Sequence, residues 1–194
     1  MFIELTDHLR CPEDHDESFL VLLPDKMEGR FVRTGQLGCP VCGRTFELVD
    51  GVFDAGSPEP STEPSTLTAE AATVLAGLSG PGGYLALVGP PASLSKEIAE
   101  RLPGVALVAV NPNSGVMDGD AVSVIRARRI PIKSRALRGV VLGKPYAEDP
   151  YWISEAARVV LPGLRIVGEG ADPPGGSIDV MASTGTTWVG TVRR

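Results

Sequence analysis

A Cys-x-x-Cys pair constrains the first third of this chain more than any other feature of its sequence. Cys39 and Cys42 lie in a Gly-Cys-Pro-Val-Cys-Gly stretch, where two thiols share one tight turn. The following Gly43 permits a left-handed backbone that directs amide groups at the sulfurs. The third cysteine, Cys11, lies upstream in a Cys-Pro-Glu-Asp-His segment. Three cysteines cannot all pair in disulfides, so the pattern favours a metal site.

The fourth ligand of such a site must come from another residue type. Structural zinc takes four ligands, and imidazole is a commoner ligand than carboxylate. Asp14, at the place of a second cysteine, and His8 are the alternatives to the imidazole of His15. In the competing interpretations the Cys-x-x-Cys pair is redox-active or merely buried, and the imidazole is solvated. The predicted ligands of a closed, structural Cys3His site are Cys11, His15, Cys39 and Cys42.

Residues 55–66 separate two stretches of different composition. They read Ala-Gly-Ser-Pro-Glu-Pro-Ser-Thr-Glu-Pro-Ser-Thr, which offers little apolar surface to bury and favours extended backbone before each proline. All five Phe and all three Cys precede this stretch, whereas both Trp and all three Tyr follow it. The sequence therefore predicts a domain of residues 1–54, a linker of residues 55–66 and a domain of residues 67–194. A surface loop within one domain is the alternative.

The first stretch has the pattern of a small β-structure around a metal. Residues 18–23, 29–35 and 45–49 are predicted strands, and about fifty residues usually need a metal or disulfides to hold a fold. Cys11-Pro12, the Gly-x-Leu-x-Cys-Pro-x-Cys-Gly-Arg-x-Phe stretch of residues 35–46 and the Asp-Gly-Val of residues 50–52 resemble the zinc-ribbon family that activates tRNA, rRNA and translation-factor methyltransferases. The resemblance implies a zinc-pinned ribbon and a protein partner, such as a methyltransferase or a translation component. The fourth cysteine of that family is missing here.

Apolar strands alternate with helices after the linker. Such alternation predicts an α/β fold, in which a mostly parallel, Rossmann-like sheet is covered on both faces and binds ligands at its carboxyl edge. A Ser-Thr-Gly-Thr turn joins the last two strands as an antiparallel hairpin. The predicted helices are residues 66–78, 93–102 and 149–161. The predicted strands are residues 84–88, 105–110, 121–125, 137–142, 164–167, 177–182 and 187–192.

This order of elements resembles the class I S-adenosylmethionine-dependent methyltransferase fold. The resemblance is carried by Glu-Ala-Ala-Arg-Val-Val-Leu-Pro-Gly-Leu-Arg-Ile-Val (155–167), by Leu-Ala-Leu-Val-Gly (85–89) and by Ile-Pro-Ile (130–132). It implies cofactor contacts at Gly89, Ser93 and Asn111. In the family's Asp-x-Gly-x-Gly-x-Gly motif, however, Leu87 takes the acidic place, Pro91 and Ser93 replace glycines, and Asn111 replaces the acid that grips the ribose. S-adenosylmethionine is therefore a doubtful cofactor.

A basic segment without acidic residues follows the third predicted strand of the second domain. Clustered arginines of this kind bind phosphates, which makes RNA a candidate partner. No aromatic residue interleaves to stack bases, so docking on the acidic first domain, binding of a protein partner or a solvated loop are the alternatives. The segment comprises Arg126, Arg128, Arg129, Lys133, Arg135 and Arg138.

Charge and residue inventory limit the function further. The net charge of −6 argues against a general nucleic-acid coat, and no apolar run suits a signal peptide or a membrane span, so a cytoplasmic location is expected. The only two histidines lie in the first domain, which leaves the second without a Ser-His-Asp or Cys-His arrangement. The predicted function is a zinc-binding, non-catalytic binding or scaffold protein with a degenerate methyltransferase-like domain. An active methyltransferase with an atypical pocket and an RNA-associated module are the alternatives.

Overall fold

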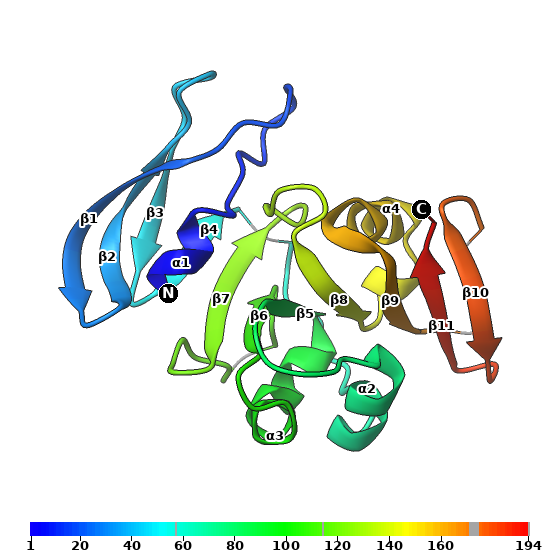
Figure 1. Ribbon diagram of the computed structural model, residues 1–194. Coiled ribbons are helices and arrows are strands. Elements are labelled where there is room, and N and C mark those ends of the chain that lie inside the picture. Colours follow the sequence, from blue (N-terminus) through cyan, green and yellow to red (C-terminus); the bar gives the residue numbers. More distant parts are fainter. Residues whose placement is uncertain (57, 114, 171–174, 194) are drawn as a thin grey trace.

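The computed structural model describes residues 1–56, 58–113, 115–170 and 175–193. Within these ranges the strands form one eleven-stranded sheet in the order β1-β2-β3-β4-β7-β6-β5-β8-β9-β11-β10 (Figure 1). Along the chain the elements are α1 (Ile3–Thr6), β1 (Val21–Glu28), β2 (Phe31–Gly38), β3 (Thr45–Val49), β4 (Val52–Ala55), α2 (Ala69–Ala76), β5 (Tyr84–Val88), the 3-10 turn η1 (Pro90–Leu94), α3 (Ser95–Arg101), β6 (Ala106–Val110), β7 (Val122–Ala127), β8 (Leu137–Leu142), the 3-10 turn η2 (Tyr146–Glu148), α4 (Pro150–Val159), β9 (Val160–Glu169), β10 (Ile178–Ser183) and β11 (Thr187–Val192).

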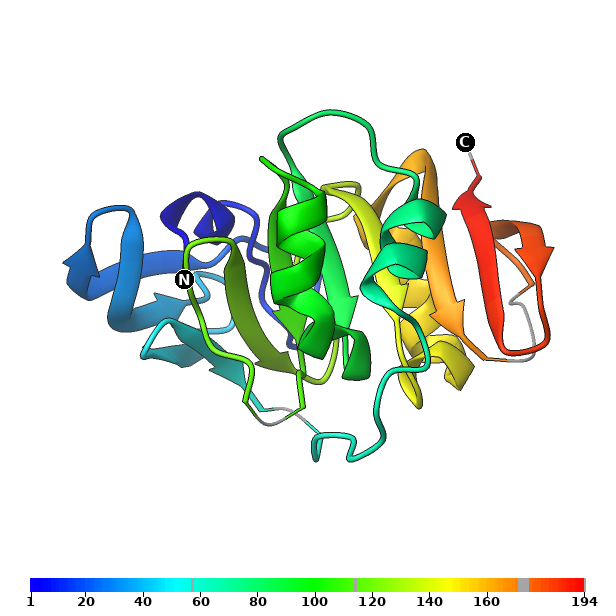
Figure 2. The ribbon, with the colours of Figure 1, turned by 90° about the horizontal axis from the view of Figure 1, so that it is seen from below.

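The centre of the sheet is parallel and covered on both faces. Strands β7, β6, β5, β8 and β9 run in one direction, with α2 and α3 on one face and α4 on the other (Figure 2). All five residues of β5 are buried, as a strand between two helical layers requires. The predicted hairpin is present as β10 and β11, and β11 pairs antiparallel with β9. The α/β architecture predicted from the sequence is confirmed.

The predicted helices are present with shifted ends. Thr68 caps α2 by accepting a hydrogen bond from the Ala71 amide, and Gly77 ends it with a φ of 62°. Asp149 caps α4 in the same way. The prediction that this helix extends to residue 161 is wrong, because β9 begins at Val160 and a register shift lets it continue through Pro162. None of the helices in the described ranges has the length and hydropathy of a membrane span.

The N-terminal strands continue the central sheet. Strands β1 to β4 form an antiparallel meander, and β4 then pairs in parallel with β7, which places Phe53 beside Ile125. A second seam joins residues 8–10 to residues 131–133, through bonds from the Arg10 amide to the Pro131 carbonyl and from the Lys133 amide to the His8 carbonyl. Strand β4 was not predicted, because four residues are too few to show a period and the partner strand lies far along the chain.

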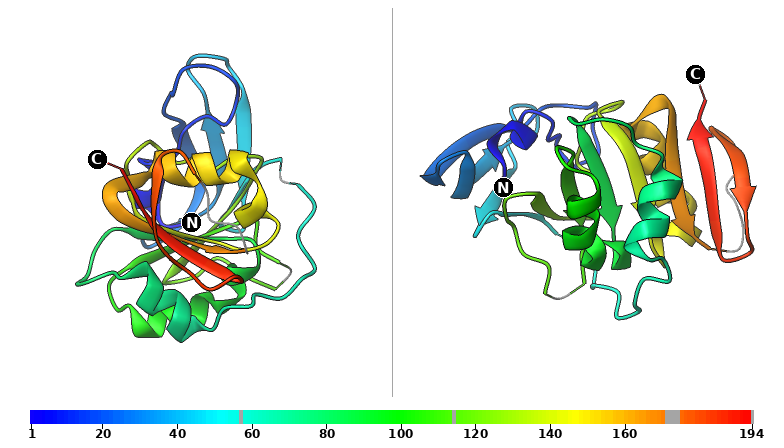
Figure 3. Two further views of the ribbon diagram at one scale, coloured as in Figure 1. Left: turned by 90° about the vertical axis from the view of Figure 1, so that its right-hand side faces the viewer. Right: turned by 60° about the horizontal axis from the view of Figure 1, so that its bottom comes forward.

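Two apolar cores lie on the two faces of this sheet. The core on the α4 side continues from the N-terminal strands, where Val32 and Phe53 are buried, to Trp152 and Trp188 at the other end. The second core fills the space between the sheet and helices α2 and α3. The views in Figure 3 show the same arrangement, with the N-terminal strands at one end and the C-terminal hairpin at the other.

Candidate metal centre and cofactor crevice

Two loops at the N-terminal end of the sheet bring the cysteines together. The first loop is closed at its base by a hydrogen bond of 2.9 Å from the Cys11 amide to the Ser18 carbonyl. The second is the predicted Cys-x-x-Cys turn, closed by the Gly43 amide on the Cys39 carbonyl at 3.0 Å. Gly43 has the left-handed φ of 72° that the sequence predicts for it. Both loops are therefore shaped by backbone hydrogen bonds.

The side chains of the four predicted ligands converge on one point. The distance from Cys11 Sγ to Cys42 Sγ is 3.8 Å, and that from Cys39 Sγ to His15 Nε2 is 3.5 Å. All four ligand atoms lie within 4.8 Å of one another. A tetrahedral zinc ion with ordinary bond lengths separates two sulfurs by ~3.8 Å, and a sulfur from a nitrogen by ~3.6 Å. The cluster thus has the dimensions of a Cys3His metal site.

The protonation states of this cluster also suit a divalent cation. The imidazole Nδ1 of His15 lies 2.7 Å from the Asp16 carbonyl; as the donor of that bond it leaves the Nε2 lone pair facing the sulfurs. Burial opposes ionisation of Cys39, but hydrogen bonds from the Cys42 and Val41 amides lower its pKa to about 6. Burial raises the pKa of Cys11 to about 12. A cation at the centre would supply the charge that lets this buried thiol ionise.

The two alternative fourth ligands lie elsewhere. The His8 ring packs edge-on against Tyr84, with 5.2 Å between the ring centroids. Asp14 lines a cleft of about 650 Å³ that Arg128 and Asp54 also line. Among the described residues, the cluster that could hold a metal contains neither of them.

The loop of residues 11–18, which carries Cys11 and His15 and which we call the metal loop, is fixed to the central sheet by a charged network. The Glu17 carboxylate accepts hydrogen bonds from the Ser134 amide at 3.0 Å and from the Arg158 guanidinium at 3.1 Å. Arg158 also pairs with the buried Glu155 at 2.9 Å, and Arg129 pairs with Glu155 at 3.1 Å. A movement of the metal loop would therefore change the hydrogen bonds and ion pairs of the residues that connect β7 to β8.

Two arginines of the basic segment, Arg129 and Arg138, are engaged by the protein itself. Arg129 is in the network around Glu155, and Arg138 donates to the carbonyls of Ser79 and Gly82 at 2.6 Å each. Arg126 and Arg128 line two different clefts. The partners of Arg129 and Arg138 lie within residues 67–194, so these contacts are not docking on the acidic first stretch, and they give no support to RNA binding.

The Glu155 network predicts a pH-dependent stability. Burial raises the pKa of Glu155, but hydrogen bonds from Arg158 and Arg129 outweigh it and hold the pKa below its usual range. Stability from a depressed carboxylate pKa is present above the unfolded pKa and is lost as the pH falls through the folded pKa. We expect Glu155→Gln to lose about 1–2 kcal/mol at pH 7 and less at pH 4, measured by urea unfolding. Glu148→Gln, at an exposed pair with Lys144, should show no such trend. A difference between wild type and Glu155→Gln that stays constant with pH would contradict this expectation.

At the carboxyl end of β5, the loop expected to hold a cofactor is packed against the loop after β8. Gly89 has a φ of 71°, and a Cβ placed there would come within 2.5 Å of the Tyr146 ring. Pro90 and Pro91 are buried, and their rings fill the space that a side chain at Gly143 would need. Tyr146 is buried as well, so an aromatic ring lies where the backbone would approach a ligand.

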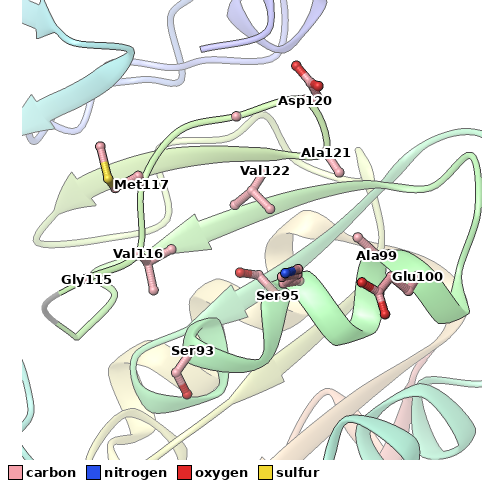
Figure 4. Close-up of a pocket in the computed structure, with 12 residues that line it drawn as sticks. Ser93, Ser95, Ala99, Glu100, Gly115, Val116, Met117, Asp120, Ala121 and Val122 are labelled. Atoms are coloured by element: carbon pink, nitrogen blue, oxygen red, sulfur yellow. The ribbon is translucent and has the colours of Figure 1, made fainter.

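The other two predicted cofactor residues are also turned toward the protein. Asn111 is 2% exposed; its side-chain nitrogen donates to the Ala127 carbonyl at 2.8 Å, and its oxygen accepts from the Ala127 amide at 2.9 Å. The Ser93 hydroxyl donates to the Pro90 carbonyl at 2.8 Å. Ser93 lines a separate pocket of about 710 Å³ between α3 and residues 115–122 (Figure 4). The three residues do not present the contacts that S-adenosylmethionine requires, and the chain does not fit this cofactor there.

The crevice also holds a segment of the chain that the sequence did not place there. The Glu63 carbonyl accepts a hydrogen bond of 3.0 Å from the Asn113 side chain, just beyond β6. The amides of Thr66 and Leu67 donate to Glu169, the last residue of β9, at 2.9 and 3.0 Å. We missed Glu169 and Tyr146 as residues of this site. A polar residue directly after an apolar strand was the signal that could have identified Glu169.

No protein-family model and no curated protein matches this chain. Solved structures match at low identity. A protein from Corynebacterium glutamicum aligns with a TM-score of 0.50 and 14% identity over 68% of this chain and 83% of that one. A methyltransferase dependent on S-adenosylmethionine from Aquifex aeolicus gives 0.45 and 13% over 64% and 88%. A complex between the Haloferax volcanii Trm112 methyltransferase activator and a protein classed as a methyltransferase gives 0.42 and 16% over 52% and 50%, so this chain spans about half of that structure's length. At these identities the similarities concern the fold alone.

Proposed function

We propose that this protein is a zinc-stabilised binding or scaffold protein that has kept a methyltransferase-like fold without its cofactor. Asn111 carries the proposal. Both ends of its side-chain amide are bound to Ala127 and the residue is only 2% exposed, so the side chain is turned into the protein and away from a ribose. Binding a nucleoside there would break two buried hydrogen bonds, each of which is costly to leave unmade. The ring of Tyr146 against Gly89 supports the same conclusion.

We propose that the metal is zinc and that its role is structural. Cys11 and His15 come from one loop and Cys39 and Cys42 from another, so an ion would cross-link two otherwise separate turns. Four protein ligands leave no coordination position for water or substrate, which is the arrangement of structural rather than catalytic zinc. The ion would therefore hold the N-terminal strands in the shape that pairs with β7.

We propose a protein as the partner. Strand β1 lies at the edge of the sheet. Its residues Val21 and Leu23 are 45% and 64% exposed, and Phe19, two residues before the strand, is 56% exposed. An apolar row beside an unpaired strand edge is a surface that proteins bind through backbone pairing and side-chain contacts. RNA would require free arginines, and two arginines of the basic segment, Arg129 and Arg138, are bound by the protein itself.

Calorimetric titration with S-adenosylmethionine tests the proposal. The zinc-loaded chain, shown to be folded by circular dichroism, should give no binding heat at high micromolar cofactor. The heat of dilution is measured by titrating the cofactor into buffer and is subtracted. Saturable binding with a micromolar Kd would overturn the proposal in favour of an active methyltransferase with an atypical pocket.

A further inference from the structure

The connection between β4 and α2 must cross the carboxyl edge of the sheet. Strand β4 runs parallel to β7 and therefore ends at that edge, while α2 begins beside Glu169 at the carboxyl end of β9. Strands β7, β6, β5 and β8 lie between these two points. Five strand spacings amount to about 24 Å, which the connecting residues can span when extended. Figure 2 shows the connection along this edge of the sheet.

The segment of residues 58–67, which we call the strap, is held where it reaches β9. Glu169 is only 1% exposed, and a single oxygen of its carboxylate, Oε1, accepts from the Thr66 and Leu67 amides and from the Ser65 hydroxyl. Its other oxygen, Oε2, is buried and accepts no hydrogen bond from the described residues. Two consecutive amides can reach one oxygen only where the backbone bends, and the chain does bend at Thr66 and Leu67, so the buried carboxylate holds the strap at this bend.

The rest of the strap is matched in polarity and charge to the crevice. Asn113 donates to the Glu63 carbonyl, so main-chain groups are bound at two places along the strap. Lys144, just after β8, has a raised pKa chiefly because of its hydrogen bond with Glu148, and the charges of Glu63 and Glu169 add to the shift. The strap therefore passes close to this lysine and places an acidic side chain near it.

The strap sequence contains the bound motif twice. Residues 59–62 and 63–66 are both Glu-Pro-Ser-Thr, and only the second copy contacts the edge strands through the bonds described above. Each copy contains one proline, which restricts the residue before it and so lowers the entropy lost on binding. The first copy supplies a matched control in the same chain.

We propose that the carboxyl edge of the sheet is a binding site for a Glu-Pro-Ser-Thr segment, that its resident ligand is the second repeat of this chain's own strap, and that Glu169 is its recognition residue. This inference rests on the proposed function in one respect, namely that no nucleoside cofactor occupies the crevice. A peptide held at both β6 and β9 spans the ends of β5 and β8 and shields the edge where Rossmann-like folds bind their ligands.

Amide hydrogen exchange of the full zinc-loaded chain tests the proposal. We expect the amides of Thr66 and Leu67 to be protected in the wild type, and Ser65→Ala to speed their exchange about tenfold. Ser61→Ala, the same change in the first repeat, should leave them unaffected. Glu169→Ala should abolish their protection, and Ser65→Ala keeps the test valid if that variant fails to fold.

Two outcomes would overturn the proposal. One is exchange of the Thr66 and Leu67 amides at free-peptide rates in the wild type. The other is an equal effect of Ser61→Ala and Ser65→Ala. Failure of the proposed function is distinguishable, because it appears as binding heat with S-adenosylmethionine while the exchange measurement reports the strap alone.

Discussion

Removal of the metal should unfold the N-terminal strands and destabilise the whole chain. Structural zinc contributes roughly 10–16 kcal/mol in small zinc-dependent peptides, which is comparable to the whole stability of an ordinary domain, about 5–15 kcal/mol. The four ligands lie on two loops that are joined, apart from the metal, by the pairing of Val21 with Gly38 and by the ion pair of Glu13 with Arg44. We therefore expect a strong chelator, or Cys42→Ser, to lower the Tm by more than 10 °C, measured by circular dichroism.

Matched variants identify the ligand set. Val41→Ser introduces a serine next to position 42, as a control for Cys42→Ser. The Val41 side chain is 65% exposed, so this change should leave zinc content and Tm unchanged. Asp14→Asn should also retain one zinc per chain, whereas His15→Asn should weaken zinc binding at least tenfold. Unchanged zinc content in Cys42→Ser, or zinc loss in Asp14→Asn, would show that the assigned ligands are wrong.

Restoring the acid of the methyltransferase family at position 111 should destabilise this protein. Asn111→Asp keeps an acceptor for the Ala127 amide but loses the donor to the Ala127 carbonyl, and it turns a carboxylate toward that carbonyl in a buried site. We expect a loss of about 3 kcal/mol or more in the free energy of unfolding, measured with urea. The variant should show no binding of S-adenosylmethionine.

Asn113→Asp is the control for this change. It lies two residues further along the same loop and makes a single exposed bond to the Glu63 carbonyl, so its cost should stay below about 1 kcal/mol. An Asn111→Asp variant that keeps wild-type stability and gains binding of S-adenosylmethionine would contradict both this prediction and the proposed function.

The predictions from sequence succeeded where the signal was local. The Cys-x-x-Cys turn with Gly43 and the buried strand of residues 84–88 each depend on neighbouring residues, and the structure has both. Strand β4 was missed because its partner, β7, lies about seventy residues away. Asn111 was placed correctly at the end of a strand. Its bond to Ala127 could not be predicted, because this bond depends on which strand lies beside β6 in the folded sheet.

The linker shows what composition can and cannot predict. Its proline-rich composition correctly indicated a segment without helix or strand, and the described residues 58–67 have neither. Composition alone could not show that the segment crosses the carboxyl edge of the sheet, because this follows from the position of β4 beside β7. The interaction of Leu67 with Glu169 thus depends on the topology of the whole sheet.

The parallel pairing of β4 with β7 has a consequence for the order of events during synthesis. The metal loops can close once residue 42 has left the ribosome, but β4 must wait until β7, which ends at Ala127, has also emerged. Until then β4 exposes an unpaired strand edge, the kind of surface that associates with other chains. Early capture of the ion would limit this risk, because it would hold the first three strands in place while the ribosome completes their neighbour.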